Sequence, residues 1–250
     1  MSSAHFQYVL RLGDNALVLG QRLSEWCGHS PFLEEDIAMA NTALDHIGRA
    51  RMLLSHAGAI EGRGRDEDAL AYLRDEREFG NFLVCELPNG DYAFTLVRQY
   101  LLDVYHQLLF EALTASADEE LAAIAAKAVK EAAYHARRSG DWVLRFGDGT
   151  DESQARAQAA LDELWSYTGE LCTPDAVDEA MQAAGIAPDL EQLAARWREI
   201  VEAHLAAATL SVPPADWQAG GGREGLHTEH MGRLLAEMQF VQRAYPGLNW

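Results

Sequence analysis

A carboxylate and a histidine on one predicted helix are the residues whose spacing comes nearest to a metal site. Glu131 and His135 lie four residues apart in a run without proline. In helical bundle proteins that bind two metal ions, a ligand helix supplies the pattern Glu-x-x-His, in which the histidine is the third residue after the glutamate. The third residue after Glu131 is Tyr134. The histidine therefore comes one residue too late for this pattern.

Helical periodicity places both side chains on the apolar stripe of their helix, with Leu121, Ile124 and Ala128. A carboxylate that faces a protein core needs a hydrogen-bonding partner or a metal ion, because burial of an unpaired charge is costly. Two interpretations remain open at this point. Glu131 and His135 form a hydrogen-bonded polar patch between helices, or they bind metal.

Three other predicted helices also contain an acidic residue near mid-length. These residues are Asp14, Asp45 and Asp103, and His106 follows the last at three residues. We expect Asp45 to share a stripe with Ala38, Asn41 and Met52. The third residue after Asp45 is Gly48, which has no side chain to bind a metal.

A di-iron centre in a bundle uses four carboxylates and two imidazoles. The two imidazole positions are Gly48 and Tyr134 in this chain. The sequence therefore predicts a vestigial metal site that binds no metal, at Asp14, Asp45, Gly48, Asp103, Glu131, Tyr134 and His135. The alternative is a ferritin-like metalloenzyme with an unusual site of its own, built from Asp45, Asp103, Glu131 and His135.

The placement of the seven prolines indicates the elements that position these residues. Residues 32–87 and 89–173 contain no proline, are separated only by Pro88, and are rich in helix-favouring residues. We predict an all-α fold, a single domain over 1–250 with a core bundle over about 5–146 and additional helices over about 151–245. The expected helices are 5–27, 32–57, 66–86, 91–114, 118–146, 151–171, 175–184, 189–208 and 228–244.

Composition limits the classes of partner. The formal net charge is -19, and the sequence pI is about 4.7. A chain with this charge repels nucleic acid and anionic membranes, so we expect neither as a partner and favour a basic protein subunit. Three widely spaced cysteines and the lack of a long apolar segment predict a cytoplasmic protein with reduced thiols.

Five short motifs, in matching order along nearly the whole chain, carry a family resemblance. They are residues 10–15 (LRLGDN), 24–29 (SEWCGH), 74–77 (RDER), 88–90 (PNG) and 225–230 (GLHTEH). Together they resemble the structural subunits of bacterial 1,2-phenylacetyl-CoA epoxidases. The spread of the motifs is more specific than any one of them.

The resemblance implies a ferritin-like subunit without a working metal site or bound cofactor, in a hetero-oligomer. Its expected partners are a catalytic di-iron subunit, a further small subunit and a reductase. The resemblance further implies that the catalytic partner epoxidises phenylacetyl-CoA with electrons from NADPH, in phenylacetate catabolism. Gly48 and Tyr134 agree with the loss of metal binding in this chain.

A cluster of ionisable residues near the C-terminus follows the glycine-rich loop at 220–225. His227, Glu229 and His230 are too close together for a usual helical zinc motif. Thr228 is a candidate N-cap with Glu229 in the first helical turn. We therefore expect a capped helix start at an interface rather than a metal site, and we expect Arg74 and Arg77 to be further interface residues.

Coenzyme A has several phosphate charges, so a chain that contacts it must supply cations. A third hypothesis is therefore a thioester-binding module. The alternating charges of residues 74–78 (RDERE) are more typical of a salt-bridged surface or a contact between subunits, and we do not assign substrate contacts to any of the arginines considered. The arginines considered are Arg63, Arg65, Arg74, Arg77, Arg137 and Arg138.

Overall fold

The computed structural model describes residues 4–214 and 217–248, and within these residues the regular structure is helical, as predicted. The long helices are α1 (Ala4–Ser24), α2 (Leu33–Glu61), α5 (Tyr92–Leu113) and α6 (Glu119–Gly147). The shorter α-helices are α3 (Glu67–Tyr72), α4 (Leu83–Glu86), α7 (Asp151–Leu164), α8 (Gly169–Cys172), α9 (Ala176–Ala183), α10 (Leu190–Ala207), α11 (Glu229–Met238) and α12 (Phe240–Ala244). Three 3-10 helices, η1 (Glu76–Glu78), η2 (Trp165–Tyr167) and η3 (Gly222–Glu224), lie between them.

The chain divides into two compact units. Unit one comprises Met1–Pro88 and Gly220–Trp250, and unit two comprises Asn89–Ala219. Each unit contains one pair of long helices, α1 with α2 and α5 with α6. This division into units does not test the expected domain organisation, so the single domain over 1–250 stays a prediction.

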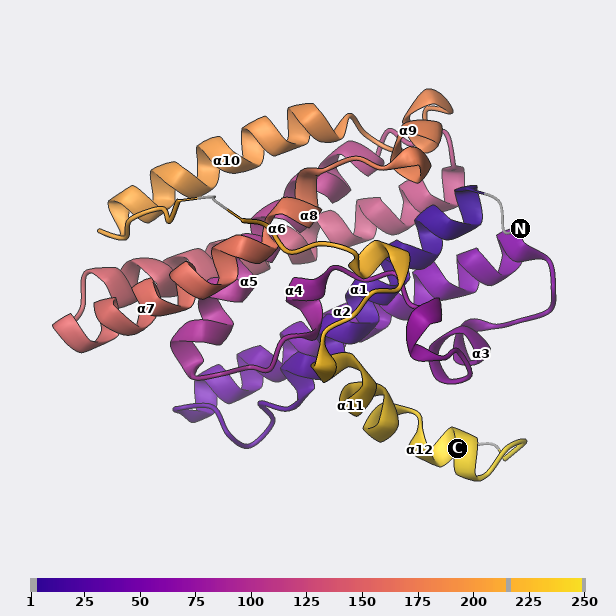
Figure 1. Cartoon of the computed structure of the whole chain (residues 1–250), viewed down its shortest axis with the longest axis horizontal. Coiled ribbons are helices and arrows are strands. Elements are labelled where there is room, and N and C mark those ends of the chain that lie inside the picture. The colour runs from indigo at the N-terminus through magenta and orange to yellow at the C-terminus, as the bar shows by residue number, and fades with distance from the viewer. Residues whose placement is uncertain (1–3, 215–216, 249–250) are drawn as a thin grey trace. The chain divides into compact units, whose positions relative to one another are not determined.

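The helices α1 and α2 lie side by side in unit one (Figure 1). Gly20 of α1 lies against α2, where an added Cβ atom would be 2.9 Å from Ile47 Cδ1 and 3.2 Å from His46 Cβ. The absence of a side chain at Gly20 therefore lets the two helices approach closely. Val9, Ala16 and Leu19 of α1 are buried.

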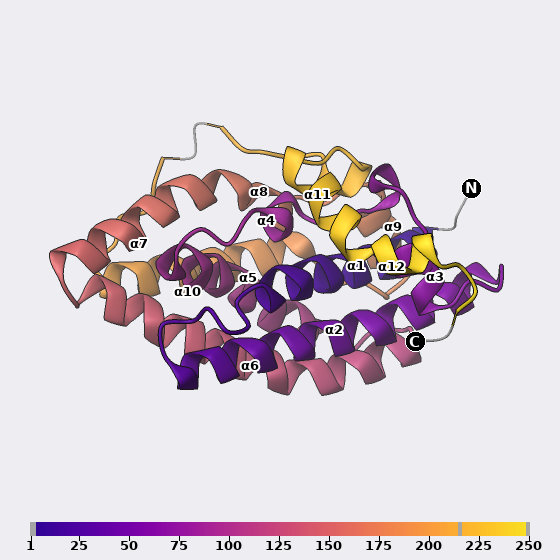
Figure 2. The same ribbon diagram turned by 90° about the horizontal axis from the view of Figure 1, so that it is seen from below.

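In unit two, α6 turns back through a short loop into α7 (Figure 2). Both helices pack on α5, and α10 packs on α5 and α6. Trp197 of α10 donates a hydrogen bond from Nε1 to the carbonyl oxygen of Leu101, at 2.9 Å, and its ring stacks on Trp165. His204 of α10 stacks on Tyr100, with 4.6 Å between ring centroids. Aromatic rings thus attach α10 to its unit.

Acidic and hydroxyl side chains begin most of these helices. In each of the following residues, the side chain accepts a hydrogen bond from a backbone N–H in the first helical turn and satisfies a group that has no partner within the helix. These N-caps are Asp66, Asp91, Asp118, Thr150, Asp175, Asp189 and Thr228. The prediction that Thr228 is an N-cap is therefore confirmed.

Three of the expected helices are interrupted. In the segment expected as a helix over 66–86, α3 ends at Tyr72 and is followed by η1. The next α-helix, α4, begins only at Leu83. Here Asp75 and Glu78 form a capping box, in which each side chain bonds the backbone of the other, and Phe79 follows in an extended conformation. The helix expected over 151–171 likewise changes to η2 after Leu164. In the one expected over 228–244, α11 ends at Met238 and α12 begins at Phe240. Local side-chain bonds to the backbone compete with helix continuation at the first of these breaks.

The segment that begins at Gly220 packs on α4 and η1 of unit one through α11, and Gly222 of η3 lies against Leu83 of α4. Gly225 has φ of 76°, and a Cβ atom there would lie 2.3 Å from the carbonyl oxygen of Arg77. Both the left-handed backbone and the close approach require glycine. The backbone that Gly225 approaches belongs to unit one of its own chain.

No helix in the described part of the chain is long and apolar enough to cross a membrane. None of the three cysteines forms a disulfide bond within the described residues; Cys27 is exposed and Cys85 is buried.

Candidate functional site

The acidic residue of α1, Asp14, is the centre of a buried ion pair. Its carboxylate accepts hydrogen bonds from both terminal nitrogens of Arg74, and from the backbone N–H of Gly80 at 2.9 Å. The side chains of Asp14 and Arg74 are 0% and 2% exposed. Arg74 also donates to the carbonyl oxygen of Glu78, and its guanidinium lies 4.0 Å from the centre of the Phe79 ring. The pair therefore joins α1 to the chain around η1.

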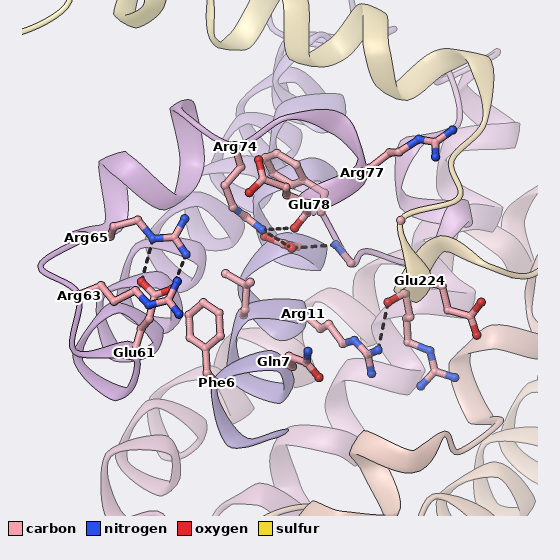
Figure 3. Close-up of a pocket in the computed structure, with 16 residues that line it drawn as sticks. Phe6, Gln7, Arg11, Glu61, Arg63, Arg65, Arg74, Arg77, Glu78 and Glu224 are labelled. Atoms are coloured by element: carbon pink, nitrogen blue, oxygen red, sulfur yellow. Dashed lines mark hydrogen bonds and ion pairs between the residues drawn. The ribbon is translucent and has the colours of Figure 1, made fainter. Parts of the chain in front are cut away.

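A cavity of about 530 Å³ lies beside this ion pair, within unit one. Figure 3 shows Arg63 and Arg65 near Glu61 at one side of it, and Arg11 and Glu224 at the other. Arg65 donates two hydrogen bonds to Glu61. These bonds lower the pKa of Glu61, against the opposing effect of its burial, and raise the pKa of Arg65. Glu61 therefore stays ionised, and its carboxylate is paired with Arg65.

A second buried carboxylate, Glu86 of α4, holds the C-terminal segment. His227 Nδ1 lies 2.8 Å from Glu86 Oε2, and the backbone N–H of Thr228 donates to Oε1 at 2.6 Å. The other ring nitrogen of His227, Nε2, lies 3.1 Å from the carbonyl oxygen of Phe79. Because both ring nitrogens face oxygen acceptors, this arrangement suits the doubly protonated, cationic imidazole.

The electrostatics agree with this protonation state. Burial by itself lowers the pKa of His227, but the hydrogen bond to Glu86 and the charge of that carboxylate outweigh burial, so the pKa of His227 is raised. The carbonyl oxygen of Phe79 and the charge of Glu76 act in the same direction. His227 and Glu86 therefore form a charged link inside unit one.

On α2, the predicted stripe through Asp45 is wrong. Asp45, Ala38 and Met52 are only partly buried, and Asn41 is exposed. The buried face instead contains Met39, Thr42, Ala43, His46, Arg49, Ala50, Leu53 and Leu54. Gly48 is exposed, and a Cβ atom there would meet nothing within 4 Å. The apolar stripe of α2 thus runs one residue later than we expect from the sequence.

On α6 of unit two, the predicted stripe is confirmed: His135 is buried with Leu121, Ile124 and Ala128, and Glu131 is partly buried. Asp103 of α5 is buried as well. Ser139 of α6 donates to Asp103 at 2.8 Å and to the carbonyl oxygen of His135 at 2.9 Å. Tyr134 is 46% exposed. Ser139, which we do not select from the sequence, therefore links the two helices at these positions.

The donor set at the vestigial positions does not fit a di-iron centre. Both carboxylate oxygens of Asp14 accept hydrogen bonds from Arg74, Gly48 has no ligand atom, and Tyr134 points to the surface of its unit. With the N–H of Gly80, the donors of Arg74 occupy three of the roughly four lone-pair sites of the Asp14 carboxylate, and the positive charge of Arg74 beside it opposes a metal ion. The positions of the two missing imidazoles supply no replacement ligand.

The residues expected at an interface divide into two groups. Arg74 and His227 are buried within unit one, so they join parts of their own unit, and the expectation that their side chains contact another protein is wrong. Arg77 is exposed, and the side chains of Glu229 and His230 are 81% and 28% exposed. These three remain available for contact.

Sequence reasoning missed Glu86 and Arg22, which complete the C-terminal link. Arg22 of α1 donates two hydrogen bonds to the backbone carbonyl of Glu86, at 2.8 and 2.9 Å. The sequence does contain one signal for Glu86, since this single carboxylate directly follows three apolar residues, Leu83, Val84 and Cys85. The structure shows that all three are buried. A lone charge beside an apolar run needs a partner.

An all-α protein with long helix pairs and inward carboxylates near their middles has the ferritin-like architecture. The chain belongs to the family described as phenylacetic acid catabolic protein, whose model matches residues 1–250. It is similar to a protein of Escherichia coli (strain K12) that is named as one of the subunits of 1,2-phenylacetyl-CoA epoxidase. The two are 52% identical over 243 residues, which cover 97% of this chain and 98% of that protein. The family resemblance of the five sequence motifs is thereby confirmed.

Proposed function

We propose that this chain is the non-catalytic structural subunit of a 1,2-phenylacetyl-CoA epoxidase. The observation that carries the proposal is the 52% identity to a subunit of the E. coli enzyme over almost the full length of both chains. The side chains at the vestigial positions support the proposal, since the carboxylate of Asp14 is paired with Arg74 and the residue at position 48 is an exposed glycine. The proposed role is to bind and stabilise a catalytic partner rather than to react with substrate.

The proposed complex contains a catalytic di-iron subunit, a further small subunit and a reductase that uses NADPH. In this arrangement the partner epoxidises phenylacetyl-CoA, and this chain binds no cofactor of its own. We place the complex in the cytoplasm. Burial of apolar surface between subunits contributes about 25 cal/mol per Å² before the costs of association, so a large interface could make the partner depend on this chain.

An apolar face of α2 is our candidate for contact with the catalytic partner. Leu33, Ile37 and Leu44 are 70%, 53% and 67% exposed and share one side of the helix. Exposed apolar side chains that cluster on one face are typical of protein interaction sites. The first turn of α2 also contains Glu34, Glu35 and Asp36. A partner surface with apolar and basic residues would complement this face.

Co-expression tests the proposed role. We expect the catalytic partner to be more soluble and more active when it is co-expressed with this chain, and the two to co-purify. Ile37→Glu should reduce co-purification because it places a charge in the proposed interface, whereas Leu248→Glu, at an apolar residue that is also exposed, should not. A catalytic partner that is soluble and fully active alone would refute the scaffold role.

Metal analysis separates this role from the alternative metalloenzyme. We expect the purified chain, reconstituted with iron or manganese, to retain no stoichiometric metal. Stoichiometric metal that is lost in Glu131→Ala would instead favour a site of its own at Asp45, Asp103, Glu131 and His135.

A further inference from the structure

An open groove in unit two lies between α6 and α10 and reaches down to α5. Its volume is about 520 Å³, and Val104, Leu108 and Ile200 supply apolar lining. Three residues of α6 with a small side chain or none leave room beside that helix, and these are Ala133, Ala136 and Gly140. We call this cavity the α6–α10 groove. Its size and apolar lining suit the side chains of another molecule.

Tyr100 is a buried polar residue of this lining that has no hydrogen-bond partner. It is 3% exposed, and its hydroxyl bonds to no residue that the structure describes. Its ring stacks on His204, whose Nε2 already lies 3.0 Å from the carbonyl oxygen of Gly140. Burial raises the pKa of Tyr100, so the phenol stays protonated and can donate. Because polar groups inside proteins are normally hydrogen-bonded, this hydroxyl indicates that a ligand supplies an acceptor in the groove.

The exposed side of α6 beside the groove is basic. Between residues 121 and 141 it has three exposed cations and one exposed anion, which are Lys127, Lys130, Arg137 and Asp141. The two lysines are the only ones in a chain whose net charge is -19. Neither lysine has an ion pair within the described residues, and the guanidinium of Arg137 has only a ring contact there, 5.6 Å from the centre of Tyr134. These cations are therefore available to carboxylates of a partner.

Cations lie on both walls of the α6–α10 groove. Arg137 lines it from α6, and Arg196 lines it from α10. Arg196 pairs with Glu199 at 2.6 Å, but their side chains are 57% and 69% exposed, and surface pairs of this kind contribute little free energy. Arg196 can therefore exchange Glu199 for a carboxylate of a partner.

Two carboxylates also line the groove, and they limit what can bind. Glu111 accepts a hydrogen bond from Gln107 at 3.0 Å, and Asp141 is exposed. Together with the two arginines they leave the lining without net formal charge. A small free anion would therefore gain little inside the groove. A longer ligand can instead place apolar groups inside and carboxylates beside Arg137 and Lys130, which lie two turns apart on the same side of α6.

The length of the groove suits a helix. Its lining extends along α6 from Ala133 to Asp141, which is about 12 Å at a rise of about 1.5 Å per residue. This length matches two helical turns. A helix that binds in a groove inserts apolar residues at i, i+3 or i+4, and i+7, which also span two turns.

We propose that the α6–α10 groove binds an acidic amphipathic helix of another protein, with apolar side chains between α6 and α10 and carboxylates beside Lys130, Arg137 and Arg196. This surface differs from the apolar face of α2, whose acidic first turn suits a basic partner. The two surfaces therefore take partners of opposite charge. The proposal stands on the groove alone and does not rest on membership of an epoxidase complex.

Fluorescence anisotropy with the full chain tests the proposal. The probe is a labelled designed peptide of about 16 residues, long enough to populate a helix, with leucines on one face and glutamates beside them. A matched peptide carries lysines in place of the glutamates. We expect saturable binding of the acidic peptide and weaker binding of the basic one. The net charge of the chain by itself predicts the reverse order, so the comparison separates the groove from general attraction.

A pair of arginine variants locates the contact on α6. Arg137→Glu should weaken binding of the acidic peptide about fivefold, because it replaces an attraction by a repulsion. Arg145→Glu is the matched control and should leave binding unchanged. Arg145 is also an exposed arginine of α6, it lies 5.1 Å from the centre of the Trp142 ring, and it does not line the groove.

Two further variants test the interior of the groove. Ala133→Trp should abolish binding, because it fills the groove from an exposed position at which a larger side chain does not disturb the core. Tyr100→Phe removes only the hydroxyl and should weaken binding about threefold. Circular dichroism of each variant checks that its fold is retained.

Several outcomes would overturn the proposal. They are tighter binding of the basic peptide, equal weakening by Arg137→Glu and Arg145→Glu, and full binding by Ala133→Trp. Sedimentation velocity of the chain without peptide tests the other occupant. Self-association that Arg137→Glu abolishes would also overturn the proposal, because a second copy of the chain would then occupy the groove.

Discussion

The C-terminal segment of unit one and α10 of unit two both return from far along the chain, but their contacts differ in charge. The segment from 220 to 248 buries Met231, Leu234 and Leu235, and it also has charged contacts, with His227 on Glu86 and Arg243 on Asp75. Helix α10 is held mainly by uncharged side chains, with Trp197 on Trp165 and Leu193, Val201 and Leu205 buried. The charged contacts depend on the protonation and identity of each partner, whereas the uncharged contacts depend mainly on the area that is buried.

The ion pair between Asp14 and Arg74 should be the most sensitive contact of unit one. In Arg74→Met, Asp14 would remain buried without its counter-charge, and the loss of a partner from such a pair costs about 3–5 kcal/mol of unfolding free energy. The backbone carbonyl of Arg74 also accepts from Gln239 and Arg243. We therefore expect chemical unfolding of Arg74→Met at lower denaturant, with faster hydrogen exchange in α1 and in the C-terminal segment.

A double variant separates lost charge from lost packing. In Asp14→Asn with Arg74→Met, the buried charge is absent, while the asparagine side-chain oxygen can still accept from the N–H of Gly80. This variant should recover part of the loss. Arg51→Met, which removes an exposed partner of Glu67, should change stability by less than about 0.5 kcal/mol. Equal losses in Arg74→Met and Arg51→Met would contradict the structural role of the pair.

The link between His227 and Glu86 should make the stability of unit one depend on pH. The folded-state pKa of His227 is raised, so folding favours its cationic form. The stabilisation is fully present below the ordinary histidine pKa of about 6.5 and is lost as pH rises through the raised value. At pH 6, His227→Gln should cost about 2–3 kcal/mol, as expected for a charged, buried hydrogen bond, and the cost should shrink toward pH 9.

The relevant measurement is the difference in unfolding free energy between His227→Gln and the unaltered chain at several pH values. Other charged groups around His227 are Glu86 and Glu76, and Arg22 donates to the backbone of Glu86. His29, in an exposed loop, provides the control, and His29→Gln should give a small difference at every pH. A cost of His227→Gln that is constant from pH 6 to 9 would exclude the cationic form as the stabilising species.

Most helix boundaries were predictable because local signals set them. Proline positions, acidic first turns and N-cap residues depend on neighbours in sequence, and they located α5, α6, α9 and α10 to within about two residues. The break in the segment 66–86 was not predicted, because it depends on the capping box of Asp75 and Glu78 and on contacts with α1 and α11. Tertiary contacts override helix propensity there.

The candidate site was less predictable than the helices. His135 was correctly expected to face inward, because apolar residues precede it at helical spacing, and Asp14 and Asp103 are buried as well. On α2, large apolar residues lie on the exposed face as well as on the buried face, so a shift of one residue made Asp45 rather than His46 the expected inward residue. The partners of the buried carboxylates lie 60 and 141 residues away in sequence, and no local pattern identifies partners at such separations.

Substitution of Trp197 should have the smallest of these effects on unfolding free energy, and it gives the sharpest contrast with unit one. Trp197→Phe keeps an aromatic ring near Trp165 but removes the hydrogen bond from Nε1 to the carbonyl oxygen of Leu101. A neutral hydrogen bond contributes about 1 kcal/mol, and neither Trp197 nor Leu101 has an ionisable side chain. The loss should therefore be about 1 kcal/mol at pH 6 and at pH 9 alike, measured by circular dichroism during chemical unfolding. If the loss changes with pH as strongly as in His227→Gln, then ionisable groups also hold α10, and the division between charged and uncharged attachment fails.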